Sequence, residues 1–172
     1  MKTYEGLIEL IYDGVTNDAA WADALELVAE TVGAAGAGLG VQDMETHAFW
    51  AVAQSGVDVA LHETYQRLAP ENHIWRAIGR AGRPMADQMV MPKTAFARTA
   101  LHAEWFVPQG FHSVMAAPVM ANGSHCGVVV AFGGRARGDF EALDLDQLGR
   151  LGRHLSQALS LRLDRMRLAD AL

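Results

Sequence analysis

Two apolar segments joined by a turn dipeptide constrain the fold of this chain more than any other feature. Both segments lie within residues 111–134, and Asn122 and Gly123 separate them. This dipeptide is favoured in two-residue β-hairpin turns, in which both loop residues need positive φ. The segments are rich in valine, alanine and methionine, so the sequence predicts an antiparallel hairpin with Asn122 and Gly123 as its loop.

The predicted hairpin is mostly apolar on both faces. With that loop, Ala117 pairs with Val128 on one face, and Ala116 pairs with Val129 on the other. A sheet with one face in water alternates apolar and polar residues. We therefore expect this hairpin at the centre of the molecule, covered by helices or a pocket on each side. Pro118 has no N–H for the ladder, which predicts a bulge or an unpaired position there.

Length and composition are those of a single globular domain over residues 1–172. Apolar residues make up 51% of the chain and charged residues 20%, which is ordinary for a globular protein. There is no apolar run of about 18 residues and no apolar signal core at the N-terminus, so we expect a cytoplasmic protein without a membrane partner. The formal net charge of −6 argues against a basic face that binds nucleic acid.

Two amphipathic helices are predicted before the first strand. Residues 4–15 and 18–32 have apolar side chains at helical spacing, and Asn17 is suited to cap the second helix. Residues 35–42 and 47–53 have the alternation of strands. The two helices need a sheet or a partner to cover their apolar faces.

Three glycines share one face of the first predicted strand: Gly36, Gly38 and Gly40. A strand face without side chains allows the close approach of a helix or of a ligand. We expect a helix there, because close helix packing is the commoner use of small residues. A dinucleotide-binding fingerprint is excluded because a turn, rather than a helix, follows these glycines.

The middle of the chain combines short helices with many aromatic residues. Helical spacing covers residues 61–68, 72–78 and 93–107. Residues 85–90 could form a short edge strand between two prolines. We expect this region to form a lid over the sheet.

A long amphipathic helix is predicted from residue 140 to the end of the chain. Leucines and a methionine form its apolar stripe. Roughly 30 helical residues span about 45 Å, which is more than a domain of this size needs for its own core. A second copy of the helix is the economical partner for the far end, so we expect a homodimer with twofold symmetry.

The sequence lacks the motifs of metal and nucleophilic catalysis. His62 and Glu63 are followed by Gln66 where a zinc protease motif needs its second histidine, and His102 has no downstream cysteine pair of the zinc deaminase kind. Cys126 is the only cysteine, so it forms no internal disulfide. We therefore predict no catalytic residue, no metal site and no cofactor.

Aromatic and polar residues of the middle region and of a strand could converge above one face of the hairpin. Aromatic walls with a few polar groups suit a small organic ligand. The candidate ligand-binding residues are Trp50, Tyr65, His73, Trp75, Asp87, Trp105 and Met115. The same residues could instead form a second hydrophobic core of the domain.

The stretch 98–112 and the hairpin that follows it resemble the N-terminal sensory region of one group of LuxR-family bacterial transcription regulators. In that group a GAF/PAS-like domain precedes a helix-turn-helix domain. Residues 7–21 and 84–88 fit the same pattern, so the resemblance covers nearly the whole chain. The group often carries Asp-Pro-Trp in its middle segment, of which this chain keeps only the tryptophan, in residues 73–75.

The resemblance implies an α+β fold with a central antiparallel sheet of about five to six strands. The N- and C-terminal helices would cover one face, and short helices and loops the other. It also implies a non-catalytic, small-molecule-sensing domain of a LuxR-type regulator, with residues 140–172 as a signalling and dimerisation helix. Ligand binding would shift the arrangement of that helix. DNA would be bound only through a helix-turn-helix domain, which we do not find within residues 1–172.

Two other functions compete with ligand sensing. The chain could be a structural dimerisation domain that binds no ligand. It could also be a GAF-type enzyme such as a methionine sulfoxide reductase, but that chemistry uses several cysteines and Cys126 is alone.

Overall fold

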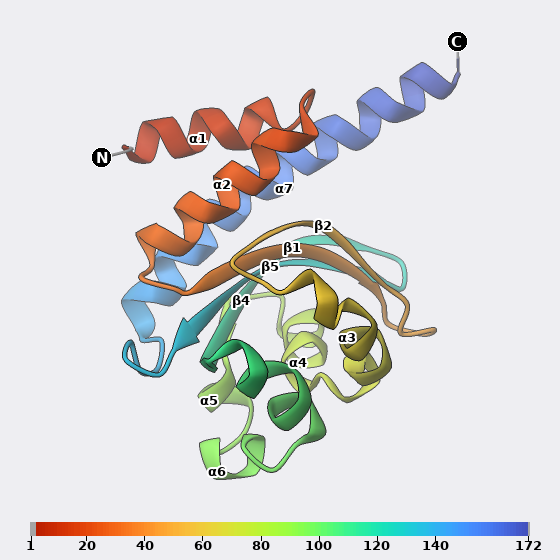
Figure 1. The fold of residues 1–172 in the computed structure, drawn as a ribbon. Coiled ribbons are helices and arrows are strands. Elements are labelled where there is room, and N and C mark those ends of the chain that lie inside the picture. The colour runs from red at the N-terminus through yellow and green to blue at the C-terminus, as the bar shows by residue number, and fades with distance from the viewer. Residues whose placement is uncertain (1–2, 172) are drawn as a thin grey trace.

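A five-stranded antiparallel sheet lies between two helical layers in the computed structural model, which describes residues 3–171 (Figure 1). The strand order is β2-β1-β5-β4-β3, so the hairpin of β4 and β5 lies inside the sheet. This architecture confirms the predicted α+β class. The strands are β1 (Gly36–Asp43), β2 (Phe49–Ser55), β3 (Met85–Ala86), β4 (Phe111–Asn122) and β5 (His125–Gly134).

The loop of the central hairpin lies one residue later than predicted. Asn122 is the last residue of β4 and pairs with His125, which leaves Gly123 and Ser124 as the loop. Gly123 has a φ of 60°, and a glycine with positive φ at the first loop position is what a type II′ turn requires. The dipeptide Gly-Ser therefore forms the turn in place of Asn-Gly.

The pairing register of β4 and β5 also differs from the prediction. The ladder contains a bulge between Pro118 and Met120, which confirms the irregularity expected at the proline. Beyond the bulge, Ala117 pairs with Val129 and not with Val128. Because a shift of one residue moves a side chain to the opposite face, the residues of β5 lie on the faces opposite to those predicted relative to β4.

Both faces of the hairpin are buried, which confirms its central position. One face packs against the long helices with Met115, Ala117, Val129 and Ala131. The other face packs against the short helices with Val114, Ala116, Val128 and Phe132. Each of these side chains is at most 7% exposed. The sheet thus divides the apolar residues into two separate cores.

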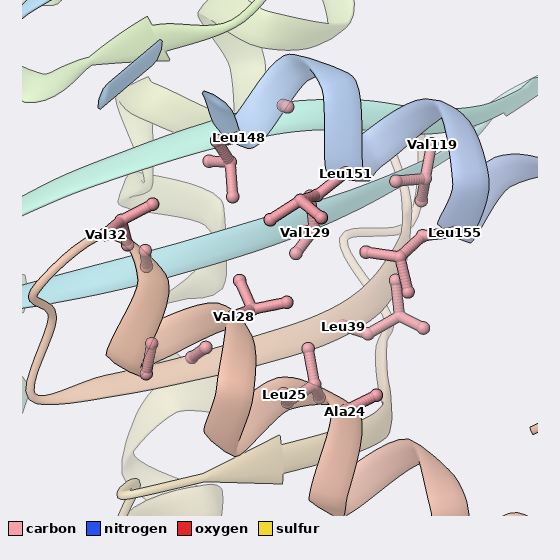
Figure 2. Close-up of a cluster of buried hydrophobic side chains, with 14 of the residues drawn as sticks. Ala24, Leu25, Val28, Val32, Leu39, Val119, Val129, Leu148, Leu151 and Leu155 are labelled. Atoms are coloured by element: carbon pink, nitrogen blue, oxygen red, sulfur yellow. The ribbon is translucent and has the colours of Figure 1, made fainter. Parts of the chain in front are cut away.

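The first core lies under helices α1 (Tyr4–Asp13), α2 (Asp18–Thr31) and α7 (Ala142–Asp170). Asn17 caps α2, because its Oδ1 accepts a hydrogen bond of 3.1 Å from the Ala19 N–H. Side chains of α2, α7 and the sheet meet between the two layers in Figure 2. They include Leu25, Val28, Leu39, Val129, Leu148, Leu151 and Leu155.

The second core lies under short helices that connect β2 to β4. They are α3 (His62–Leu68), α4 (His73–Ala81), α5 (Asp87–Val90), α6 (Lys93–Phe96) and a π-helical turn (His102–Phe106), with 3₁₀ turns at Val59–Leu61, Ala69–Glu71 and Val107–Gln109. Figure 1 shows this layer on the side of the sheet away from α2 and α7. The predicted lid is therefore present.

Two predicted elements of this layer are interrupted. The helix expected over 93–107 breaks after α6, where the Thr99 hydroxyl donates to the Phe96 carbonyl and accepts from the His102 N–H. Such local side-chain bonds compete with the helical ladder. The strand expected over 85–90 ends at Ala86, because Asp87 turns inward and accepts a hydrogen bond from the Val114 N–H of β4.

The glycine face of β1 lies against the aromatic layer, so the expectation of a helix there is wrong. The long helices pack against Ala37 and Leu39 on the opposite face. At Gly40, a Cβ atom would lie 2.6 Å from a ring carbon of Phe49 and 3.2 Å from Trp75. The missing side chain therefore lets two aromatic rings lie directly on the strand.

Helix α7 begins at Ala142, two residues later than predicted, and extends past the rest of the domain. The Glu141 N–H donates to Asp144 Oδ2 over 2.7 Å at its start. Its last buried residue is Leu159. Figure 1 shows the C-terminal part of the helix reaching beyond the sheet, and its exposed apolar residues are Leu161, Leu163, Met166 and Leu168.

Truncation of Leu155 to alanine should destabilise the domain by about 2–5 kcal/mol, because its side chain is fully buried between α7 and the sheet. Leu143→Ala is the matched control on the same helix. Leu143 is 70% exposed, and its truncation should change the stability by less than about 0.5 kcal/mol. Urea denaturation followed by circular dichroism measures both values, and equal losses would contradict the two-layer packing.

A methyl group at Gly40 should destabilise the domain by about 1–3 kcal/mol, because it would overlap the Phe49 ring. Gly38→Ala is the control on the same strand face. There the added Cβ would lie 3.3 Å from Val130 Cγ1, and we expect a change of less than about 1 kcal/mol. The same urea denaturation measures the free energy of unfolding of both variants. If Gly40→Ala left this free energy unchanged, the rings would not lie on this strand.

Candidate functional site

A cavity lies in the second core, between the sheet and the short helices. The empty space of the cavity, counted together with the open solvent at its mouth, is about 770 Å³. Strand residues of β1, β2, β4 and β5 border it on one side, and residues of α3, α4 and the segment 101–106 on the other. Its aromatic lining residues are Phe49, Tyr65, Trp75, Trp105, Phe106 and Phe132.

The aromatic rings that line the cavity pack against one another at an angle. The ring of Phe49 lies 4.7 Å from that of Tyr65 and 5.5 Å from that of Trp75, at interplanar angles of 66° and 89°. Trp105 lies 5.2 Å from Tyr65 and 5.1 Å from Phe132. Edge-to-face pairs of this kind are favourable beyond their burial alone. They hold the rings apart as walls, which preserves space between them.

Two polar side chains at the wall are fixed by the start of α4. Asn72 is the N-cap of this helix, and its Oδ1 accepts a hydrogen bond of 3.1 Å from the Trp75 N–H. Its Nδ2 therefore faces away from the helix and donates to the Tyr65 hydroxyl over 2.8 Å. Burial raises the pKa of the Tyr65 phenol well above its usual value, so the hydroxyl stays protonated at neutral pH.

The remaining polar lining lies toward solvent. Asp58 and His62 are exposed, and Gln54 is half-buried. The indole N–H of Trp75 points away from these groups and donates to the Cys126 carbonyl over 3.3 Å. The cavity thus has an apolar interior, the polar pair Asn72 and Tyr65 at one wall, and exposed polar residues at its opening to solvent.

Three of the seven candidate residues line this cavity together: Tyr65, Trp75 and Trp105. They come from α3, α4 and the π-helical turn, so segments far apart in the sequence bring them together. Whether they bind a ligand stays a prediction.

The other four candidates lie outside the cavity, and their predicted placement is wrong. Trp50 follows Phe49 on β2, points away from the cavity, is 49% exposed and stacks on the ring of His125. His73 is exposed at the first turn of α4. Met115 lies in the core on the helical side of the sheet, because alternation along β4 puts it on the face opposite to Val114 and Ala116, which line the cavity.

Asp87 is fully buried but serves a different purpose from that predicted. Its Oδ1 accepts from the Val114 N–H over 3.1 Å, and its Oδ2 pairs with Lys93 Nζ over 2.6 Å. Lys93 also pairs with Asp139 at 2.9 Å and donates to the His112 carbonyl at 3.1 Å. This carboxylate therefore connects the short helices to the segment that leads into α7.

Several lining residues were missed by sequence reasoning. Phe49 and Phe132 line the cavity, and so do Val114 and Ala116 in place of Met115. Alternation along β2 separates Phe49 from Trp50, but it does not tell which of the two side chains faces inward. Phe132 was predicted on the same hairpin face as Val130, and the structure places both on the cavity side of the sheet.

Within residues 3–171, no group of three or more histidine, cysteine, aspartate or glutamate side chains is arranged to hold a metal ion. Cys126 is buried and lies outside the cavity lining, and burial raises the pKa of its thiol. None of the helices in this described range is long and apolar enough to cross a membrane.

Comparison with solved structures shows the same fold in several bacterial proteins. The LBD domain of VqsR from Pseudomonas aeruginosa has a TM-score of 0.73 at 10% identity, covering 94% of this chain and 96% of that chain. The GAF domain/HD domain protein from Geobacter sulfurreducens has a TM-score of 0.63 at 16% identity, covering 88% and 97%. The GAF domain of a phosphoenolpyruvate-protein phosphotransferase from Coxiella burnetii has a TM-score of 0.60 at 15% identity, covering 96% and 95%.

A search of curated proteins found no significant match to this chain. The family model for the GAF domain, however, matches residues 16–159. That range runs from the start of α2 to the last buried residue of α7 and so includes the sheet and the cavity. This chain is therefore a member of the GAF domain family.

Proposed function

We propose that this chain is the non-catalytic sensory domain of a LuxR-type bacterial transcription regulator and binds a small organic molecule in its cavity. The aromatic cavity with a fixed polar pair at its wall is the observation that carries the proposal. Cavities of this composition suit small organic ligands. The resemblance of residues 98–112 and the hairpin to the sensory regions of LuxR-family regulators supports this class of regulator, and the VqsR LBD domain has a similar fold. DNA would be bound through a separate domain, and the protein would act in the cytoplasm.

Ligand binding would reach α7 through polar contacts at the start of that helix. Lys93 of α6 joins the buried Asp87 to Asp139. Gln88 of α5 donates to the Phe140 carbonyl over 2.6 Å. The layer of short helices, part of which borders the cavity, is therefore tied to Asp139 and Phe140, which lie just before α7. A ligand that moves this layer would bias the position of α7.

We further propose that α7 mediates a homodimer. The four exposed apolar residues after Leu159, at positions 161, 163, 166 and 168, lie beyond the sheet and are 37–69% exposed. A second copy would bury the same surface on both chains. These residues also favour the second candidate function, a dimerisation domain that binds no ligand, so binding and dimerisation need separate tests.

Binding to the cavity can be tested with 1-aminoanthracene, a neutral dye whose fluorescence rises in apolar surroundings. We expect saturable binding to the wild-type protein. Ala51→Leu should weaken it about tenfold, because Ala51 is an exposed residue at the cavity wall and leucine would narrow the mouth. Ala121→Leu, on an exposed residue near the hairpin tip, is the control and should bind as the wild type does. If no binding is detected, or if both variants bind equally, the sensory proposal fails.

Dimerisation can be tested by replacing Leu161, Leu163, Met166 and Leu168 together with glutamine, which preserves helix propensity. Light scattering should give about twice 18.6 kDa for the wild type and 18.6 kDa for the variant. Leu143→Gln changes an exposed leucine at the other end of α7 and should leave the dimer intact. A monomeric wild type, or a variant that still dimerises, would contradict the role of α7.

A further inference from the structure

The hydrogen bonds around Tyr65 fix which way each proton points. The Asn72 carbonyl oxygen is occupied by the Trp75 N–H, so the Asn72 amide group must donate to the Tyr65 oxygen. The Tyr65 hydroxyl is thus an acceptor toward Asn72, and its own proton remains to be donated. Within residues 3–171 no protein acceptor for this proton is found.

This unused donor lies at the cavity wall. Tyr65 and Asn72 both line the cavity, and Tyr65 is only 7% exposed. The phenol stays protonated at neutral pH because burial disfavours the phenolate. A buried donor without a partner is costly, so a ligand that offers an acceptor here would gain a bond that the empty cavity lacks.

The charge of the lining points to an uncharged ligand. Among the residues that the structure describes, no lysine or arginine lines the cavity, and the only carboxylate in the lining is Asp58 at the mouth. A carboxylate or phosphate inside would lose its hydration without finding a cationic partner. The six aromatic rings instead favour an apolar, flat molecule.

Building on the sensory function proposed above, we infer that the cavity takes a neutral, mainly aromatic molecule that carries a carbonyl or another uncharged oxygen acceptor. The Tyr65 hydroxyl donates to that oxygen, and the rings of Trp75 and Trp105 enclose the apolar part. Asn72 is the positioning residue, because its cap bond at α4 holds the Tyr65 hydroxyl in the donating orientation.

Three probes with one ring system test this inference: 2-acetylnaphthalene, 2-ethylnaphthalene and 2-naphthoate. The first has a neutral carbonyl, the second has no acceptor, and the third is an anion at neutral pH. Calorimetric titration of the wild-type protein should show the acetyl compound binding about tenfold more tightly than the ethyl compound. The naphthoate should bind at least about tenfold more weakly than the acetyl compound.

The variant Tyr65→Phe keeps the ring and removes only the donor. In this variant, 2-acetylnaphthalene and 2-ethylnaphthalene should bind with about equal affinity. Because both affinities are measured on the same variant, a change in its stability does not affect their ratio. Tyr12→Phe is the matched control, since the Tyr12 hydroxyl bonds to Gln157 on the helical side of the sheet. It should keep the wild-type preference.

If Tyr65→Phe does not fold, the carbonyl stretch of 2-acetylnaphthalene bound to the wild type gives the answer. A frequency below that of the same probe in hexane supports the Tyr65 bond, and an unchanged frequency overturns it.

The possible failures are distinguishable. Equal affinity for the acetyl and ethyl probes, or tighter binding of naphthoate, would overturn the inference and leave the sensory function standing. Loss of binding for all three probes and for 1-aminoanthracene would overturn both.

Discussion

The burial of both faces of the β4–β5 hairpin is the constraint on which the rest of the structure depends. An antiparallel hairpin with one solvent-exposed face would need a covering layer only on its other face. Here Met115 and Val129 need the long helices, and Val114 and Val128 need a second layer. The short helices between β2 and β4 supply that layer, and they enclose the cavity because the angled aromatic rings leave space between them.

The two layers are not independent, because charged groups cross from one to the other at the edge of the sheet. Asp87 is fully buried, and a charged carboxylate away from water needs a cation or hydrogen-bond donors as partners. Lys93 supplies the pair and extends it to Asp139, just before α7. The contact that satisfies a buried charge is therefore also the contact through which a change in the cavity roof could reach the projecting helix.

Sequence reasoning predicted the elements and layers better than the site. The helices at both ends, the central hairpin and the bulge at Pro118 follow from periodicity and from the chemistry of proline. The register does not, because Asn122-Gly123 and Gly123-Ser124 both suit a tight turn and differ by one residue. That difference reverses the faces of the β5 residues relative to β4. Met115 and Trp50 were placed wrongly because alternation alone does not say which face of β4 or of β2 lies toward the cavity. Tyr65, Trp75 and Trp105 were found because they are large aromatic residues of helical segments that were expected to cover the sheet.

The aromatic side of the sheet holds a preformed apolar cavity, while the helical side is closely packed. Diffraction from crystals of the protein pressurised with xenon tests it directly, because xenon enters dry apolar cavities and not packed cores. We expect xenon density between Gly38, Trp75 and Trp105, and none among the leucines of α2 and α7. Side-chain density filling the space between Gly38 and Trp105, with no xenon bound there, would contradict it.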